Sequence, residues 1–233
     1  MKKGTMNLTH VERSIYKTSF LKVVTYAISI KLSGENDNEA MMGYWKFLIN
    51  EGYNVSSKSE NKDISLEGTK SDIRIFCRRN LLLIFVQEQA YKNYDLFKGQ
   101  LFRIINAYLE AMKAESISLI YMMKANEYDL NRKAEGMENV SIEDFRNVIC
   151  SKLFIEQAED GKVSGEIDGI TLIAQSMTKS DNEVHNLNIS ISGMEIVPIA
   201  VASLEKHVDK MNGAIYDMWN AVISDDMKQL MNK

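Results

Sequence analysis

The apolar residues of this chain change their spacing several times, and these changes constrain the fold more than any other feature. Within 19–32, six apolar residues share one parity, which is typical of a strand with one buried face. Within 94–113 and 203–231, apolar residues recur at steps of three and four, which is typical of a helix with one buried face. The sequence therefore predicts the α+β class, with antiparallel sheets covered by long amphipathic helices.

The first half of the chain is predicted to run in the order β-α-β-β-β-α-β. Two polar breaks, at 68–71 and 79–80, separate short apolar segments in the way that turns separate the strands of an antiparallel meander. Besides the strand and helix already described, the predicted elements are a helix at 40–49 and strands at 64–66, 73–78, 81–87 and 117–123.

Two Asp-Gly pairs organise the second half. Asp160-Gly161 and Asp168-Gly169 each stand between apolar segments, and Asp-Gly in that setting is a strong hairpin signal. We therefore expect strands on both sides of each turn, beginning with the apolar stretch 148–155. A further half-buried strand is expected at 184–192, where apolar and polar residues alternate.

The polar stretch 125–146 is interpreted as the connection between two regions, with Ser141 capping at most a short helical turn. The predicted regions are 1–130, an N-terminal α+β half, and 131–233, an antiparallel sheet plus the long helix. One continuous domain is the alternative. Strands followed by a long helix occur in both regions, so two similar halves are a further alternative, although no residue-level match shows a duplication.

Composition favours a cytoplasmic protein. At 233 residues and 45% apolar residues, the chain can bury a core without disulfides. Cys77 and Cys150 show no C-x-x-C spacing, which suits a reducing compartment. A polar run follows the basic start, so we expect no secretion signal. The longest apolar run, 81–86, is far below the roughly twenty residues of a membrane-spanning helix, so we expect no membrane partner.

The charge is unevenly distributed. Residues 1–33 carry +5 against −9 for the remainder, although the net charge is only −4. One interpretation is a basic arm on an acidic body, and the other is the solvent-facing side of the opening strand. We favour the second, because nucleic-acid binders show denser basic patches with interleaved aromatic residues. Nucleic acid is therefore not the expected partner.

No constellation of residues predicts catalysis. A nucleophilic triad needs a base beside its nucleophile. Each of the three histidines, His10, His185 and His207, has an ordinary structural explanation, and for His207 we expect a solvated helix face. The zinc-protease, calcium-loop, phosphate-loop and dinucleotide motifs do not occur. We therefore assign no catalytic residue, no metal ligand and no cofactor. Whether the chain is an enzyme is left open, and a non-enzymatic role is favoured.

Two groups of residues are candidates for binding. Lys124 and Asn126 follow the strand 117–123, and strand exits often carry recognition groups because the scaffold fixes the backbone there. The alternative is that Asn126 bonds to a turn and Lys124 is solvated. Arg74, Arg78 and Arg79 stand close together on a strand and its turn, where they form an anion site or protect an edge strand.

The region from Tyr91 through Phe145 resembles a sporadically distributed prokaryotic family of unknown function, about 230–270 residues long. That family is characterised by a helix stripe and by a strand that ends in an Arg-Tyr-Ile-Asn-like sequence. Its arginine would fall at Met123. The corresponding segments here are Tyr94-x-x-Phe97, the stripe 101–105, the strand end 121–126 and the closing helix 204–219. The resemblance implies a fold outline and a bacterial, cytoplasmic setting, but no activity.

Two functional hypotheses follow. The first is a non-enzymatic binding or interaction protein with an unknown protein partner, which the patchy family distribution associates with a bacterial mobile or defence-related operon. The second is a helix-grip-like pocket that binds or converts a small molecule. A deep apolar cavity with convergent polar groups would favour the second, and a filled interior the first. A homodimer is compatible with both.

Overall fold

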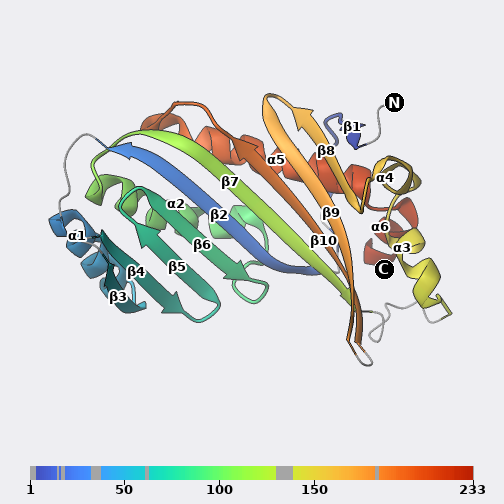
Figure 1. Ribbon diagram of the computed structural model, residues 1–233, viewed down its shortest axis with the longest axis horizontal. Helices are drawn as coiled ribbons and strands as arrows, with labels where there is room; N and C mark the ends of the chain where they lie inside the picture. The colour runs from blue at the N-terminus through green and yellow to red at the C-terminus, as the bar shows by residue number, and fades with distance from the viewer. Residues whose placement is uncertain are drawn as a thin grey trace. The chain divides into compact units, whose positions relative to one another are not determined.

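The computed structural model describes residues 4–14, 16, 19–32, 38–60, 63–129, 139–181 and 184–232 (Figure 1). Its strands are β1 (Thr5–Asn7), β2 (Leu21–Leu32), β3 (Asn54–Glu60), β4 (Asp63–Lys70), β5 (Ile73–Arg78), β6 (Leu81–Gln87), β7 (Ala114–Asp129), β8 (Lys162–Ile167), β9 (Ile170–Asp181), β10 (Val184–Glu195) and β11 (Ile199–Ala200). Its helices are α1 (Asn38–Asn50), α2 (Tyr94–Ala111), α3 (Ile142–Ile149), α4 (Lys152–Gln157), the 3-10 helix η1 (Val201–Ser203), α5 (Leu204–Val222) and α6 (Asp225–Asn232).

The predicted fold class, antiparallel sheets covered by long amphipathic helices, is wrong. The described strands belong to one mixed sheet in the order β1-β8-β9-β10-β7-β2-β6-β5-β4-β3, with β11 pairing to β7. The β1–β8 pair is parallel, whereas the meander β3–β6 is antiparallel. The α-helices described have only six to nineteen residues. The single mixed sheet could not be predicted from hydrophobic periodicity, because periodicity indicates where strands and helices lie but not which strands pair.

The predicted terminal helix at 203–231 is divided in two. Helix α5 ends at Val222, and Ile223 then forms a β-bridge with Cys150. Ser224 begins the next helix, because its hydroxyl accepts a hydrogen bond from the Met227 amide and donates one to the Val148 carbonyl. Met227 and Met231 are buried like the apolar residues of α5, so the apolar stripe continues across the break and hides it in the sequence.

The predicted strand at 148–155 is also wrong. Its residues lie in the helices α3 and α4, which are separated by Cys150 and Ser151. Ser141 and Ser151 cap these helices by accepting hydrogen bonds from the amides of Asp144 and Phe154. A short apolar run has no periodicity that distinguishes a strand from a buried helix, and here the serines before each helix were the better signal.

Several local predictions are confirmed. The elements β2, α1, β4, β5, β6 and α2 lie within a few residues of their predicted positions. Asp168 and Gly169 have φ values of 53° and 77° and join β8 to β9, as the hairpin signal indicated. Asp160-Gly161 also forms a turn with positive φ values, but helix α4 precedes it in place of a strand.

The chain forms two compact units, and each is discontinuous in sequence. Unit 1 contains 1–22, 123–193 and 211–233, whereas unit 2 contains 23–122 and 194–210. The boundary predicted near residue 130 follows the sequence connection, and these units divide the chain elsewhere. The middle of that connection, 130–138, lies outside the described residues.

Unit 2 has its core between the helices α1 and α2 and one face of its strands. Tyr44 of α1 lies edge-on against Tyr108 of α2, with ring centroids 5.4 Å apart. Gly68 of β4 brings the backbone close to α1, because a Cβ there would lie 3.4 Å from the Leu48 side chain. The strand residues buried in this core include Leu66, Ile75, Cys77, Leu82 and Ile84.

Unit 1 has its core between its strands and the part of α5 that it contains. Gly193 of β10 allows this helix to approach closely, because a Cβ there would lie 3.1 Å from Met211 and 3.4 Å from Ile215. Met211, Ile215 and Met218 are buried on this side of α5. Over the described residues, no helix is both long and apolar enough to cross a membrane.

The burial of Ile215 makes a test of the unit 1 core. Ile215→Asp places an uncompensated charge where the native side chain is 1% exposed, and should lower the free energy of unfolding by several kcal/mol, about half of a typical domain's stability. Asn220→Asp adds the same charge at a partly exposed position of the same helix and should cost less than about 1 kcal/mol. Urea unfolding of both variants measures the difference. Equal stabilities would contradict this core.

Candidate functional site

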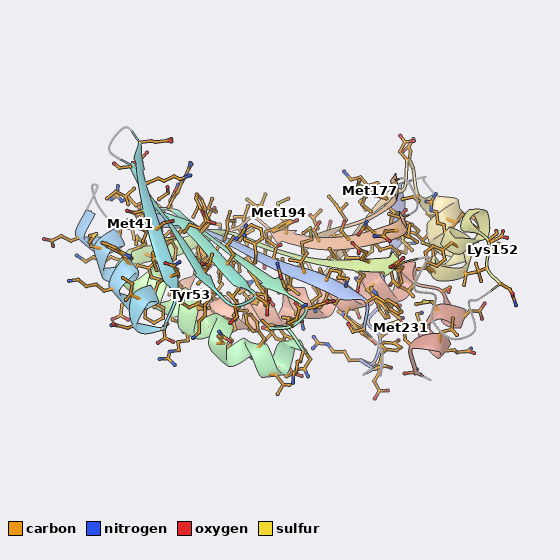
Figure 2. All side chains as sticks on the ribbon, turned by 90° about the horizontal axis from the view of Figure 1, so that it is seen from below. Met41, Tyr53, Lys152, Met177, Met194 and Met231 are labelled. Carbon is orange, nitrogen blue, oxygen red and sulfur yellow. The ribbon has the colours of Figure 1, made fainter. Side chains whose placement is uncertain are left out.

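The strands β5 and β6 present two different faces. Their residues Ile75, Cys77, Leu82 and Ile84 are buried on the side of α1 and α2. Since neighbouring residues of a strand point to opposite faces, the alternate residues lie on the other side of the sheet. These are Arg74, Phe76 and Arg78 of β5 and Leu81, Leu83 and Phe85 of β6. Figure 2 shows α2 on one side of these strands and, among the described residues, no helix of unit 2 on the other.

The strand registers bring these alternate residues together. Phe76 pairs with Leu83, which in turn pairs with Ala27 of β2. Phe85 lies between Arg74 and Thr25, and Leu81 lies between Arg78 and Ser29. The partly exposed apolar side chains are therefore continuous across β5 and β6, and they adjoin the buried Ala27 of β2. We call this surface the open face: Phe76, Leu81, Leu83 and Phe85, with Arg74 and Arg78 at its margin.

The charges at the margin of the open face are locally balanced. Arg74 Nε lies 3.7 Å from Glu67 Oε1, and both side chains are largely exposed. The Arg78 guanidinium lies 5.6 Å from the centroid of the Phe76 ring, within the range of a cation–π contact. Arg78 also borders a surface recess of about 150 Å³ that is lined by Glu60 and Asp63. The open face thus combines aromatic rings, aliphatic side chains and charges of both signs.

The three arginines that the sequence grouped together lie on two different elements. Arg74 and Arg78 share the open face, but Arg79 lies in the turn between β5 and β6. The backbone carbonyls of Arg78 and Arg79 accept hydrogen bonds from the Tyr108 hydroxyl, at 2.8 and 3.0 Å. These hydrogen bonds attach the backbone of the turn to α2, which lies on the side of the sheet opposite the open face.

Lys124 and Asn126 are not at a strand exit, because β7 continues to Asp129. They lie in unit 1, whereas the three arginines lie in unit 2. Lys124 Nζ donates a hydrogen bond to Asn212 Oδ1 of α5 at 2.7 Å, and the Asn212 residue is only 3% exposed. Asn126 is 8% exposed. The structure thus gives Lys124 a buried polar partner and not a solvated position.

Two of the histidines have carboxylate partners that the sequence analysis did not identify. His207 Nδ1 lies 2.9 Å from Glu195 Oε2, although we expected a solvated helix face. His10 Nδ1 lies 2.9 Å from Asp217 Oδ2, more than 200 residues away. Contacts at that separation leave no local pattern in a sequence. The side chain of His185 lies outside the described residues.

The thiols and carboxylates give little basis for metal or nucleophilic chemistry. Burial raises the pKa of Cys77 to about 12 and that of Cys150 to about 11, so both thiols are protonated at neutral pH. Within the part of the chain that the structure describes, no three His, Cys, Asp or Glu side chains are grouped so that they could hold a metal ion.

The apolar residues of the open face were missed as site residues, although the sequence carried a signal for them. Strand β6 reads Leu-Leu-Leu-Ile-Phe-Val, so it is apolar on both faces. A strand that needs only one buried face alternates apolar and polar residues, and continuous apolar runs indicate a second face that prefers contact. This property indicates the open face more directly than the arginines do.

Comparisons with known proteins add no functional information. No family model and no curated protein matches the chain. Among solved structures it is similar to an aspartate kinase from Clostridium acetobutylicum, with 14% identity and a TM-score of 0.21. The match covers 87% of this chain and 33% of the kinase chain, so the chain spans about a third of the kinase's length. That score is too low to show a shared fold, so the similarity says nothing about the function of this chain.

The hydrogen bond between Lys124 and Asn212 predicts that Lys124 contributes more to stability than the exposed Arg74 does. Lys124→Ala leaves the buried Asn212 oxygen without this donor and should lower the free energy of unfolding by about 1–2 kcal/mol. Arg74→Ala removes an exposed ion pair and should change stability by less than about 0.5 kcal/mol. Chemical denaturation of the two variants tests this. Equal small effects would contradict a stabilising role for the hydrogen bond between Lys124 and Asn212.

Proposed function

We propose that this chain is a non-enzymatic binding protein and that a partner protein docks on the open face of unit 2. The observation that carries the proposal is the continuity of half-buried Phe76, Leu83 and Phe85 across paired strands, with Arg74 and Arg78 beside them. Aromatic residues and arginine are enriched at protein interfaces, and contiguous apolar surface often marks an interaction site.

The balance of charge favours a protein over nucleic acid as the partner. Glu67 lies beside Arg74, and Glu60 and Asp63 lie beside Arg78. A surface that binds phosphates needs an excess of positive charge, because phosphate contacts dominate affinity for nucleic acid. A protein partner with both apolar and charged side chains matches this pattern better. Its acidic groups would compete for the two arginines, and its basic groups would bind the neighbouring carboxylates.

Three of the surface recesses have volumes of about 150, 290 and 230 Å³, below the roughly 300–1,000 Å³ of typical ligand pockets. These three recesses therefore give no support to the helix-grip alternative. The resemblance to a sporadically distributed prokaryotic family supports an accessory role in a bacterial mobile or defence-related operon. In such a role, the protein would act by holding a partner and not by converting a substrate.

The proposal predicts that substitutions on the open face weaken partner binding without unfolding the chain. Phe85→Ser and the double variant Arg74→Ala/Arg78→Ala should each lower the amount of partner recovered from native cells about tenfold, as expected for residues near the centre of an interface. Arg103→Ala is the matched control, because Arg103 and Arg74 have the same side-chain exposure, 66%, and each pairs with one glutamate. Arg103 belongs to α2, on the opposite side of the strands.

Quantitative mass spectrometry of the co-purified proteins gives the readout, and a thermal melt confirms that each variant is folded. Recovery of the same partner by all variants would contradict the open face as the docking surface. Light scattering of the pure protein tests whether the open face binds a second copy of this chain instead. If the wild type is a dimer and Phe85→Ser is a monomer, the face binds a second copy of this chain and the heterologous partner is wrong.

A further inference from the structure

Residues 4–14 form an extended segment along unit 1, which we call the strap. Its strand β1 lies beside β8 (Figure 1) and pairs with it in parallel. In this register Met6 is opposite Gly165. The Gly4 amide donates to the Gln157 carbonyl, and the Gly4 carbonyl accepts from the Ser164 amide, both at 2.8 Å. The other edge of β8 pairs with β9. The strap therefore occupies the edge of β8 that would otherwise end the sheet.

The strap is matched to that edge by its side chains as well as by its backbone. Met6 is only 2% exposed. Leu8 lies directly over Gly165, because a Cβ at that glycine would come within 2.8 Å of Leu8 Cδ1. Gly165 has no positive φ, so its missing side chain is explained by the space that Leu8 needs. The edge of β8 thus accepts an extended segment with apolar residues two positions apart.

His10 fastens the strap to two other elements. Its Nδ1 lies 2.9 Å from Asp217 Oδ2 of α5, and its Nε2 lies 3.3 Å from Asp168 Oδ2 in the β8–β9 turn. The Val11 amide also donates to Asp217 Oδ1, at 3.1 Å. Both ring nitrogens can donate at the same time only when the imidazole is protonated. The hydrogen bond that His10 donates to Asp217, with a smaller contribution from Asp168, raises the pKa of His10 above its usual value.

The attachment of the strap is therefore local and sensitive to charge. Strand β1 has three residues, and the His10 side chain is 65% exposed. The stability that His10 adds to the attachment of the strap is fully present at pH values below the unfolded-state pKa of about 6.5. It is lost as the pH rises through the raised pKa of the folded state. Asp217 and Asp168 are the charged groups that face the ring, and both favour the protonated form.

We propose that the strap is a displaceable cover, and that the edge of β8 binds an extended strand of a partner protein in its place. The partner strand would add to the sheet through backbone hydrogen bonds and would place an apolar side chain over Gly165, as Leu8 does. This inference concerns unit 1 and does not depend on the open face of unit 2.

The probe for this edge is a fluorescent peptide with the sequence of residues 4–14 and the change His10→Gln, so that the peptide's own affinity does not follow histidine titration. Fluorescence anisotropy measures its binding to the full chain. The wild type should bind it about fivefold more tightly at pH 8 than at pH 6, because a larger fraction of the straps is then open. The protein variant His10→Gln should bind it as tightly at pH 6 as at pH 8.

His207→Gln is the matched control, since it removes the other histidine with a carboxylate partner and should retain the pH dependence of the wild type. Gly165→Leu should lower peptide binding at least tenfold, because its side chain fills the space under Leu8. Hydrogen exchange at the Ser164 amide reports strap opening independently, and its protection at pH 6 should fall in His10→Gln.

Three results would overturn the proposal. The first is an exposed Ser164 amide in His10→Gln with no peptide binding, which would show that the freed edge does not accept a strand. The second is equal binding of a peptide with the same composition in scrambled order. The third is an unchanged pH dependence in His10→Gln, which would remove His10 from the control of the strap.

Discussion

The structure of unit 2 depends on the burial of one face of its strands by α1 and α2. Tyr44 and Leu48 of α1 and Leu101, Ile105 and Tyr108 of α2 are almost completely buried. Burial of such side chains is the main source of stability in a domain, at about 25 cal/mol per Å² of apolar surface. A slip of one residue in any paired strand would turn its buried face outward, so this core also fixes the register. The position of every residue on the open face follows from a core on the other side of the sheet.

This dependence separates folding from binding in the same strands. Ile75 and Cys77 hold β5 in place, whereas Phe76 and Arg78 are oriented by them and contribute less to the core. Residues on the open face can therefore change without loss of the register. Lys124 shows the opposite arrangement, because its hydrogen bond to the buried Asn212 makes it part of the packing of β7 on α5. A positive charge does not by itself show whether a residue serves binding or packing. The burial of its hydrogen-bond partner, as for Asn212, shows that the residue serves packing.

Sequence reasoning succeeded where one chain segment determines its own structure. The stripe of α2 and the Asp168-Gly169 turn are local patterns, and both are found as predicted. Strand β3 was not predicted, because Asn54–Glu60 has one apolar residue and is recruited into the sheet by pairing with β4. The end of β7 was missed because polar Lys124 and Asn126 interrupt its apolar pattern. The partner of Lys124 on α5, Asn212, is distant in sequence. The candidate site was visible only in part, because the arginines lie in one segment whereas the open face is assembled by strand pairing.

The two strands that end the described strand order, β3 and β1, show why one edge of the sheet needs a cover and the other does not. Strand β3 exposes six of its seven residues and carries Lys58 and Glu60, and charged, solvated edge strands resist pairing with other chains. Strand β8 has Val163 and Ile167 buried on one face and Gly165 between them, so its edge adjoins apolar surface. If exposed, such an edge would readily pair with another strand. The strap satisfies the edge with a three-residue strand, and the contacts of His10, the Val11 amide and the Ser14 amide with α5 hold the rest of it, which protects β8 while leaving the cover removable.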